Sequence, residues 1–153
     1  MGVSFLHELT WRGLLHQRTA EAELETHLSH SGRVGYCGFD PTSDSLTIGN
    51  LMPLMMMRHF QRAGHVPVVL VGGGTGLIGD PSGKDAERSL QTREQVEANV
   101  ASQRKIFESL LDFDAGCANR AVLVNNLDWL EPLGFLEVLR DVGKYFSVNA
   151  MIQ

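Results

Sequence analysis

The chain has 153 residues, of which 43% are hydrophobic, and its formal net charge is −5. This length and apolar content suffice for one domain with a hydrophobic core, while the acidic balance argues against a module that binds nucleic acid on its own through basic contacts to phosphate. Two distant cysteines, Cys37 and Cys117, indicate free thiols in a reducing compartment, and the first residues lack the pattern of a secretory signal. The longest apolar cluster, 51–57, is too short to span a bilayer, so we expect a cytoplasmic protein without a membrane anchor.

The first 33 residues are predicted to be a helical lead-in, and residues 34–153 the main domain. Apolar residues at near-helical spacing predict a helix over residues 4–15, with Gly13 as its stop, and a second helix over Glu21–Leu28. His27 and His30 lie three residues apart, as metal ligands can, but no third ligand stands near them. We therefore interpret them as surface histidines and predict no metal site.

The central feature of the sequence is the stretch from Tyr36 to Asn50. A predicted strand, Val34–Phe39, leads through Asp-Pro-Thr turn residues into an amphipathic helix that starts near Ile48 and ends at Gly64. Strand, loop and helix in this order direct backbone N–H groups and the positive end of a helix dipole to one place, which suits an anion such as phosphate.

The helix is predicted to bury one face, with Pro53 in about the first turn, where a missing N–H costs least. The residues expected on that buried face are Ile48, Leu51, Leu54, Met55, Phe60 and the neighbouring methionines.

A continuous apolar run at 67–71 is typical of a parallel strand that is buried on both faces. Residues 74–79 then match the dinucleotide-binding fingerprint, but turn residues follow where that fingerprint requires a helix. A phosphate-binding P-loop also fails, since Ile78 and Asp85 occupy positions that need Gly and Ser or Thr. We predict a glycine-dense ligand-binding loop at a strand end, with Asp80 as its carboxylate and Lys84 as its cation.

The remaining sequence continues the alternation of strands and helices. Thr92 caps a long helix that runs to about Leu111, residues 121–125 form a third strand, and a helix over 133–142 precedes Gly143, with another starting near residue 147. The fold class is therefore α/β, with a Rossmann-like parallel sheet and flanking helices. Three strands are only half of a doubly wound nucleotide-binding fold, so we expect the first half of a larger domain.

The ordered motifs resemble bacterial tyrosyl-tRNA synthetase, a class I aminoacyl-tRNA synthetase, over essentially the whole chain. The matching segments are Trp11–Gly13, Tyr36–Thr42, Ser45–Asn50, Gly76–Lys84, Asn125–Trp129 and Arg140–Lys144. The resemblance implies a class I catalytic domain that activates tyrosine with ATP to tyrosyl-adenylate and transfers it to tRNA. It also implies a homodimer, ATP used with Mg²⁺, and no tightly bound cofactor.

The same resemblance assigns roles to individual residues. Tyrosine binding falls to Tyr36, Gly38, Thr75 and Asp80, ATP binding to Asp40 and Gly49, and catalysis to Thr42, Thr47, Asn50, Lys84 and Arg88. By this resemblance Tyr36 meets the substrate phenol, and Asp80 receives its ammonium group with Thr75 close by. Asp40 and Thr42 line the ATP phosphates, Gly49 makes room for adenine, and Lys84 and Arg88 meet the leaving pyrophosphate.

Two departures from the family pattern leave alternatives open. The family motif His-Ile-Gly-His is Thr47-Ile48-Gly49-Asn50 here, and a short neutral Thr47 reaches less far toward pyrophosphate. The family's Lys-Met-Ser-Lys-Ser loop and its tRNA-binding regions have no counterpart in these 153 residues. We therefore expect the isolated chain to be inactive, and we keep two alternatives: a non-catalytic paralogue or fragment that binds tyrosine or nucleotide, and a related nucleotidyltransferase.

Overall fold

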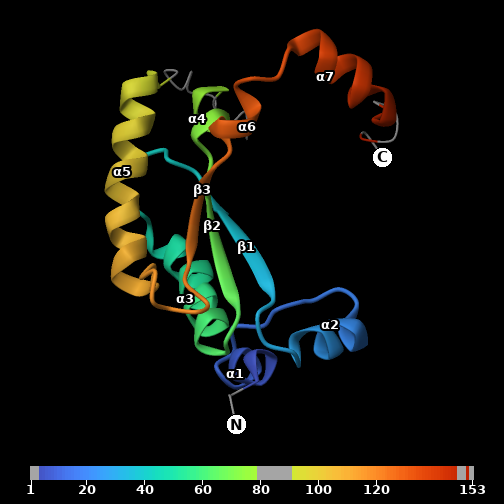
Figure 1. Cartoon of the computed structure of the whole chain (residues 1–153), viewed down its shortest axis with the longest axis vertical. Helices are drawn as coiled ribbons and strands as arrows, with labels where there is room; N and C mark the ends of the chain where they lie inside the picture. The colour runs from blue at the N-terminus through green and yellow to red at the C-terminus, as the bar shows by residue number, and fades with distance from the viewer. Residues whose placement is uncertain (1–3, 79–90, 148–150, 152–153) are drawn as a thin grey trace.

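The computed structural model describes residues 4–78, 91–147 and 151, and its centre is a three-stranded parallel sheet. The strands are β1 (Val34–Phe39), β2 (Val66–Val71) and β3 (Val122–Asn125), in the spatial order β1-β2-β3 (Figure 1). Tyr36 lies opposite Val68, and Val68 lies opposite Val122, so one register runs across the sheet. The predicted α/β fold with parallel strands is confirmed, and the three strands fall where the apolar runs placed them.

Two long helices lie along one face of the sheet, and shorter helices stand at its two ends (Figure 1). The long helices are α3 (Ile48–Arg62) and α5 (Arg93–Leu110). The shorter ones are α1 (Phe5–Trp11) and α2 (Glu21–Leu28) at the amino ends of the strands, α4 (Gly73–Ile78) and α6 (Leu127–Leu130) at their carboxyl ends, and α7 (Phe135–Asp141) with the 3₁₀ turn η1 (Gly143–Tyr145) beyond them. Sequence reasoning missed α6, which is a single turn.

Local signals end and start these helices as expected. Helix α1 closes with bonds from Gly13 N to Thr10 O and from Leu14 N to Leu9 O, and Gly13 adopts a φ of 67° that suits glycine. Helix α5 starts at the predicted cap, where the Thr92 hydroxyl accepts from the backbone N–H of Gln95.

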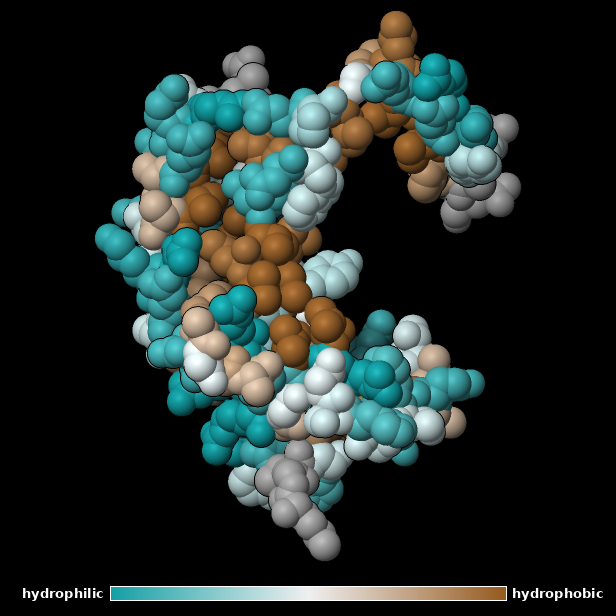
Figure 2. Space-filling view, viewed as in Figure 1, coloured by the Kyte–Doolittle hydropathy of each residue, from teal (hydrophilic) through white to brown (hydrophobic). Residues whose placement is uncertain are grey.

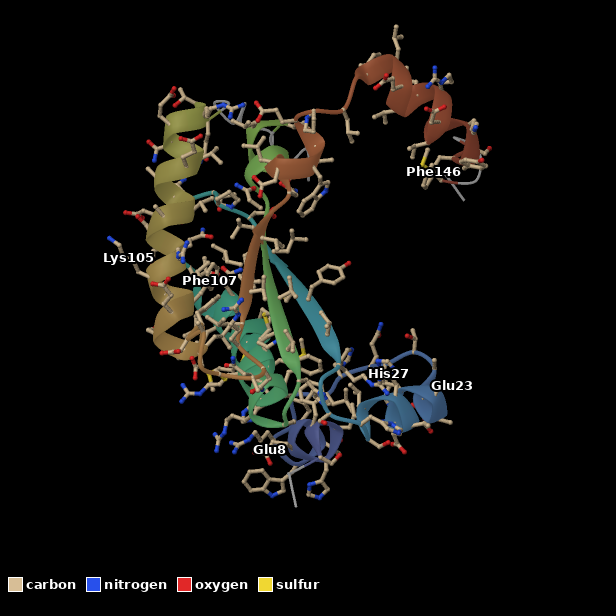
Figure 3. All side chains as sticks on the ribbon, viewed as in Figure 1. Glu8, Glu23, His27, Lys105, Phe107 and Phe146 are labelled. Carbon is tan, nitrogen blue, oxygen red and sulfur yellow. The ribbon has the colours of Figure 1, made fainter. Side chains whose placement is uncertain are left out.

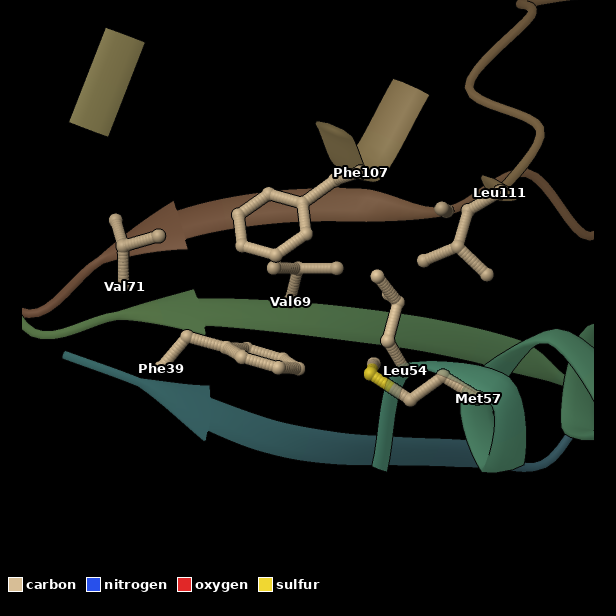
Figure 4. Packing of buried hydrophobic residues seen from close by; sticks show 8 residues of the cluster. Phe39, Leu54, Met57, Val69, Val71, Phe107 and Leu111 are labelled. Atoms are coloured by element: carbon tan, nitrogen blue, oxygen red, sulfur yellow. The ribbon is translucent and has the colours of Figure 1, made fainter. Parts of the chain in front are cut away.

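The hydrophobic core lies between the sheet and the helices α3 and α5 (Figure 4). Phe39 and Val71 are neighbours on adjacent strands and, with Val69, point to the helices, while Phe107 of α5 packs on Phe39 with ring centroids 5.0 Å apart. In Figure 3, Phe107 points from α5 toward the sheet and Lys105 points away from it. Fully burying a side chain of this size contributes about 1.5–3 kcal/mol, so this layer is the main source of stability.

The opposite face of the sheet is open in the part of the chain that the structure describes. Tyr36 is 75% exposed and Val34 is 67% exposed. Val68, which lies opposite Tyr36, and Val122, which lies opposite Val68, are only partly covered. The prediction that β2 is buried on both faces is therefore wrong, because only Pro67, Val69 and Val71 face a helix layer. Figure 2 shows apolar surface gathered at the centre of the molecule, over the strands.

Helix α3 also differs from prediction in its first turns. Ile48 is 85% exposed, and Leu51 and Met52 are exposed as well, so the buried face begins only at Leu54. No described element covers the start of the helix. Pro53 is the sixth residue of α3 and lies inside it, where it removes one helical hydrogen bond.

The segment after residue 129 exposes several large apolar side chains. Phe135, Leu136 and Tyr145 are 76–77% exposed, and α7 stands apart from the sheet in Figure 1. Such a surface is typical of a region that packs against another segment or chain. Within residues 4–78, 91–147 and 151, no helix has both the length and the apolar character needed to cross a bilayer.

Candidate active site

The carboxyl ends of the three strands bring polar groups from distant parts of the sequence together. Asp40 follows β1, Gly72 follows β2, and Asn126 follows β3, and the backbone N–H of Gly72 donates to Phe39 O at 3.0 Å. In α/β proteins this edge of the sheet is where ligands bind. Seven predicted site residues, at positions 36, 38, 40, 42, 47, 49 and 50, lie on or after β1, and Thr75 follows β2.

The missing side chain of Gly72 leaves room for Asp40 and Thr75 to lie close together. A Cβ atom at residue 72 would lie 2.6 Å from Thr75 Oγ1 and 2.7 Å from Asp40 Oδ1. Only glycine fits there without moving one of these oxygens. Residues that the family resemblance assigns to ATP (Asp40) and to tyrosine (Thr75) therefore lie beside the same backbone atom.

The glycine-rich segment after β2 is a helix, so the prediction of a loop is wrong for its first half. Side-chain amides from the end of β3 receive its first N–H groups: Gly73 N donates to Asn125 Oδ1 at 3.1 Å, and Gly74 N donates to Asn126 Oδ1 at 2.7 Å. A Cβ at Gly73 would fall 2.3 Å from Asn125 Oδ1, so this capping requires glycine. These contacts offset the low helix propensity of glycine.

The Thr75 hydroxyl is held as a hydrogen-bond acceptor. Because Asn126 Oδ1 accepts from a backbone N–H, its Nδ2 faces the other way, and it donates to Thr75 Oγ1 at 3.2 Å. The Thr75 proton goes to the Gly72 carbonyl at 3.2 Å. A remaining lone pair on an exposed oxygen is suited to a donor such as an ammonium group.

Tyr36 and Gly38 lie on the open face of β1. The two residues alternate with Cys37 and Phe39, which face the helix layer, and the Tyr36 ring is mostly exposed. A Cβ at Gly38 would meet no atom within 4 Å. Among the described residues, no side chain fills the space beside Gly38, and none makes a hydrogen bond with the phenol of Tyr36.

Cys37 has no part in this open space. Burial raises the pKa of its thiol, which keeps it protonated at neutral pH, and its side chain packs against the core. We therefore interpret it as a structural cysteine and not as a nucleophile.

The start of α3 presents one amide donor. Thr47 N donates to Asn50 Oδ1 at 3.1 Å, and since a backbone N–H can only donate, the oxygen of this amide must face Thr47. The Thr47 hydroxyl, 2.7 Å from the same oxygen, must then donate to it as well. The free donor of the pair is the Nδ2 group of Asn50, and Thr47 acts as the residue that orients it.

Two further predicted ATP contacts, Thr42 and Gly49, are exposed. Thr42 is exposed in the loop after β1, and its carbonyl accepts from Gln91 Nε2 at 2.9 Å. Gly49 is exposed in the first turn of α3, where a Cβ would meet only Thr47 Oγ1, at 3.5 Å. A flat group could therefore approach the backbone of α3 at this point.

Three predicted site residues, Asp80, Lys84 and Arg88, lie outside the described residues. Among the described ones, sequence reasoning missed the roles of Asn125 and Asn126 in capping α4 and orienting Thr75. Their signal was present, because two asparagines at the end of an apolar strand are poor strand formers with amides available to a neighbouring loop.

A cavity of about 240 Å³ lies elsewhere, between α4, α5 and β3. Its lining is largely apolar and includes Leu77, Val100 and Leu123. None of the predicted site residues lines it, so we place the candidate site at the strand ends instead.

Comparison with known protein families identifies one match, covering residues 31–153: the family described as tRNA synthetases class I (W and Y). Similar curated proteins include the tyrosine–tRNA ligase of Staphylococcus haemolyticus, 50% identical over 99% of this chain, and that of Aliivibrio fischeri, 54% identical over 97% of it. These alignments cover 36% and 34% of the two relatives, so the chain spans about a third of their length.

Solved structures of tyrosyl-tRNA synthetases are similar to this chain as well. A truncated mitochondrial tyrosyl-tRNA synthetase from Aspergillus nidulans superposes with a TM-score of 0.77 and 28% identity, over 97% of this chain and 44% of that one. The tyrosyl-tRNA synthetase of Archaeoglobus fulgidus, crystallised with L-tyrosine, superposes with a TM-score of 0.59 at 19% identity, which shows a shared fold.

Proposed function

The chain belongs to the class I tRNA synthetases of the tryptophan and tyrosine type, an enzyme family, and we propose that the protein containing it activates tyrosine with ATP and transfers it to tRNA. Tyrosine is preferred over tryptophan because relatives at 50–54% identity are named tyrosine–tRNA ligases. Because the family model covers the motifs from Tyr36 to Lys144, we do not propose a nucleotidyltransferase.

The observation that supports this proposal is that Thr75 Oγ1 and Asp40 Oδ1 both lie beside the backbone of Gly72. An amino acid bound with its ammonium group at the Thr75 acceptor has its carboxylate within reach of a nucleotide at the loop after β1. Activation of an amino acid needs this juxtaposition, because the two reacting groups must be held at near-contact distance. Asp80, outside the described residues, is proposed as the second acceptor for the ammonium group.

The open face of β1 is proposed to hold the side chain of the substrate. Tyr36 lies two strand residues from Gly38 on the same face, roughly 7 Å along the strand, so we propose that a phenol stacked over Gly38 meets the Tyr36 hydroxyl. A site that hydrogen-bonds a substrate hydroxyl discriminates against the analogue that lacks it, since its own polar group is then left unpaired.

In the proposed first step, a carboxylate oxygen of tyrosine attacks the α-phosphorus of ATP. The new P–O bond forms as the bond to pyrophosphate breaks, giving tyrosyl-adenylate and pyrophosphate, and a hydroxyl of the tRNA 3′ end then displaces AMP. The protein contributes positioning and charge stabilisation here, without a nucleophile of its own. Proposed donors to the phosphates are Asn50 Nδ2 and the N-terminal N–H groups of the 15-residue helix α3.

Further partners follow from the same proposal. ATP enters with Mg²⁺ as its counter-ion, and Lys84 and Arg88 are proposed to meet the pyrophosphate as it leaves. Transfer RNA is proposed to bind through regions that these 153 residues do not include. The exposed apolar segment around α7 is proposed to pack within a homodimer.

Exchange of radioactive pyrophosphate into ATP tests the proposal directly. The complete gene product should catalyse exchange with tyrosine and not with phenylalanine, and a variant with Tyr36→Phe and Asp80→Ala should be much weaker. The 153 residues alone should give no signal above that variant. Absence of tyrosine-dependent exchange by the complete product would refute the synthetase activity.

A second candidate, a non-catalytic paralogue that binds tyrosine or nucleotide, is favoured by the geometry of Thr47. Its hydroxyl proton is given to Asn50, so the first position of the motif offers no donor to pyrophosphate. Removing one such donor costs about 3 kcal/mol of transition-state stabilisation, on the order of a hundredfold in rate. Equilibrium binding of tyrosine and ATP without exchange would identify this candidate.

A further inference from the structure

Helix α5 buries two amide side chains against the loop that follows β1. Asn99 and Gln103 lie one helical turn apart, and they are 2% and 1% exposed. They share the buried face of α5 with Val96 and Phe107, the kind of residue expected there. Polar groups are rarely buried this deeply without a specific partner, and here the partner is one short segment of backbone.

That segment, the 40–43 loop, consists of Asp40, Pro41, Thr42 and Ser43, and each of its four carbonyl groups accepts a hydrogen bond from a side-chain amide. The donor–acceptor pairs are Gln103 Nε2 with Asp40 O (3.2 Å) and Ser43 O (3.1 Å), Asn99 Nδ2 with Pro41 O (2.9 Å), and Gln91 Nε2 with Thr42 O (2.9 Å). Since a carbonyl oxygen only accepts, the NH₂ side of each amide must face the loop. A bond from Gln95 Nε2 to Asn99 Oδ1 at 3.1 Å fixes Asn99 from its other side.

These bonds decide which way the loop presents its groups. Within the described residues, none of the four carbonyls accepts a backbone N–H, so the amides alone hold them. With its carbonyl toward α5, Asp40 places its carboxylate on the other side, next to Gly72 and Thr75. A rotated peptide group in this loop would move that carboxylate.

We propose that Gln91, Asn99 and Gln103, which we name the amide row, are positioning residues that hold the 40–43 loop in the shape that receives the ATP phosphates. This inference rests on the proposed function, which places ATP beside Asp40 and Thr42. Apolar side chains at positions 99 and 103 would fill the same buried space between α5 and the loop. They would make no hydrogen bonds to the loop carbonyls, so its peptide groups could rotate. The amide row therefore acts on the substrate through the loop and without touching it.

Replacing Gln103 by methionine tests this inference in the complete gene product. The change keeps the volume of the side chain and removes both donor bonds. Gln61→Met is the matched control, because Gln61 Nε2 also donates to two loop carbonyls, of Asp112 at 2.7 Å and Asn119 at 3.2 Å, at the amino end of the sheet. Asn99→Leu serves as a second variant that removes the bond to Pro41 O.

Steady-state pyrophosphate exchange, with ATP and tyrosine varied separately, is the first readout. Gln103→Met should raise the KM for ATP by roughly tenfold, about the effect of two lost hydrogen bonds, and leave the KM for tyrosine within twofold. Asn99→Leu should give a smaller rise of the same kind. Gln61→Met should lower the melting temperature without changing either KM.

Hydrogen exchange over residues 36–47 is the second readout, and it does not depend on activity. The amides of this segment should exchange several-fold faster in Gln103→Met than in wild type or Gln61→Met. Unchanged KM for ATP together with unchanged exchange in this segment would overturn the inference. Wild-type protein that lacks pyrophosphate exchange would refute the proposed function instead. Hydrogen exchange alone would then test the amide row: faster exchange in Gln103→Met would support its role in holding the loop, and unchanged exchange would refute it.

Discussion

Replacing Gly72 by alanine tests whether Asp40 and Thr75 act from the positions that the structure gives them. The new Cβ would lie 2.6 Å from Thr75 Oγ1 and 2.7 Å from Asp40 Oδ1. Both oxygens must retreat by about 1 Å to reach an ordinary contact of about 3.5 Å. Both belong to short side chains, so the movement shifts the groups themselves and cannot be absorbed by a flexible stem.

A misplacement of about 1 Å in a reacting assembly costs on the order of a hundredfold in rate. We therefore expect kcat/KM for tyrosine-dependent pyrophosphate exchange to fall by about that factor in Gly72→Ala, with a stability loss of about 1–3 kcal/mol from overpacking. The control is Gly35→Ala at the other end of β1, where a Cβ would lie 3.0 Å from Phe60 Cζ. It should lose stability and keep its kcat/KM.

A folded Gly72→Ala variant with kcat/KM within threefold of wild type would refute this reasoning. It would mean that Asp40 and Thr75 can be displaced by almost 1 Å without consequence, and that they do not bind the two substrates.

Three further predictions concern single side chains. Thr47→Ala should lower kcat for exchange by roughly threefold to tenfold, because Asn50 loses the hydroxyl that orients its amide, and Thr47→Ser should restore most of the loss. Asn126→Ala should raise the KM for tyrosine more than the KM for ATP, because the Thr75 hydroxyl loses the donor that fixes it as an acceptor. Burial lowers the pKa of His65 below 6.5, so the folded protein binds fewer protons than the unfolded chain. The contribution of neutral His65 to the free energy of unfolding is then complete above pH 6.5 and is lost as the pH drops toward the folded pKa. His65→Phe should therefore flatten the fall in melting temperature between pH 8 and pH 5.

Each of these has a result that contradicts it. Equal rates for Thr47→Ala and wild type would show that Asn50 needs no orientation by Thr47. An Asn126→Ala variant that affects both substrates alike would point to a general loss of structure around α4. An unchanged pH profile in His65→Phe would assign the acid sensitivity to other groups.

The strands were predictable because their signal is local. Val34–Phe39 and the run at 67–71 are short apolar segments bounded by glycine, proline and polar residues, and the structure has strands at 34–39 and 66–71. The helix start at Arg93 was predictable for the same reason, since Thr92 caps it within one turn.

Helix α4 was not predictable because its stability comes from residues about 50 positions away. The segment has three glycines in six residues, and propensity alone makes it a loop. The amides of Asn125 and Asn126 cap its N–H groups across the sheet edge, and nothing within the segment itself indicates these partners.

Burial was the least predictable property. Ile48 and Leu51 fit a buried helical face by spacing and are exposed, since the described residues provide no layer to cover them. Asn99 and Gln103 are polar residues of the kind expected on a solvated helix face. They are buried because they donate hydrogen bonds to carbonyls of the 40–43 loop. In both cases a partner distant in sequence, or its absence, decides the outcome.

The central claim is that the open face of β1, with Tyr36 and Gly38, and the polar groups of Asp40 and Thr75 beside Gly72 form a tyrosine site. The most direct measurement is kcat/KM for tyrosine and for phenylalanine in pyrophosphate exchange, in wild type and in Tyr36→Phe. Wild type should strongly prefer tyrosine, and Tyr36→Phe should lose roughly threefold to tenfold of that preference, the value of one hydrogen bond, with little change toward phenylalanine. An unchanged preference in the variant would contradict the placement of the substrate phenol against Tyr36.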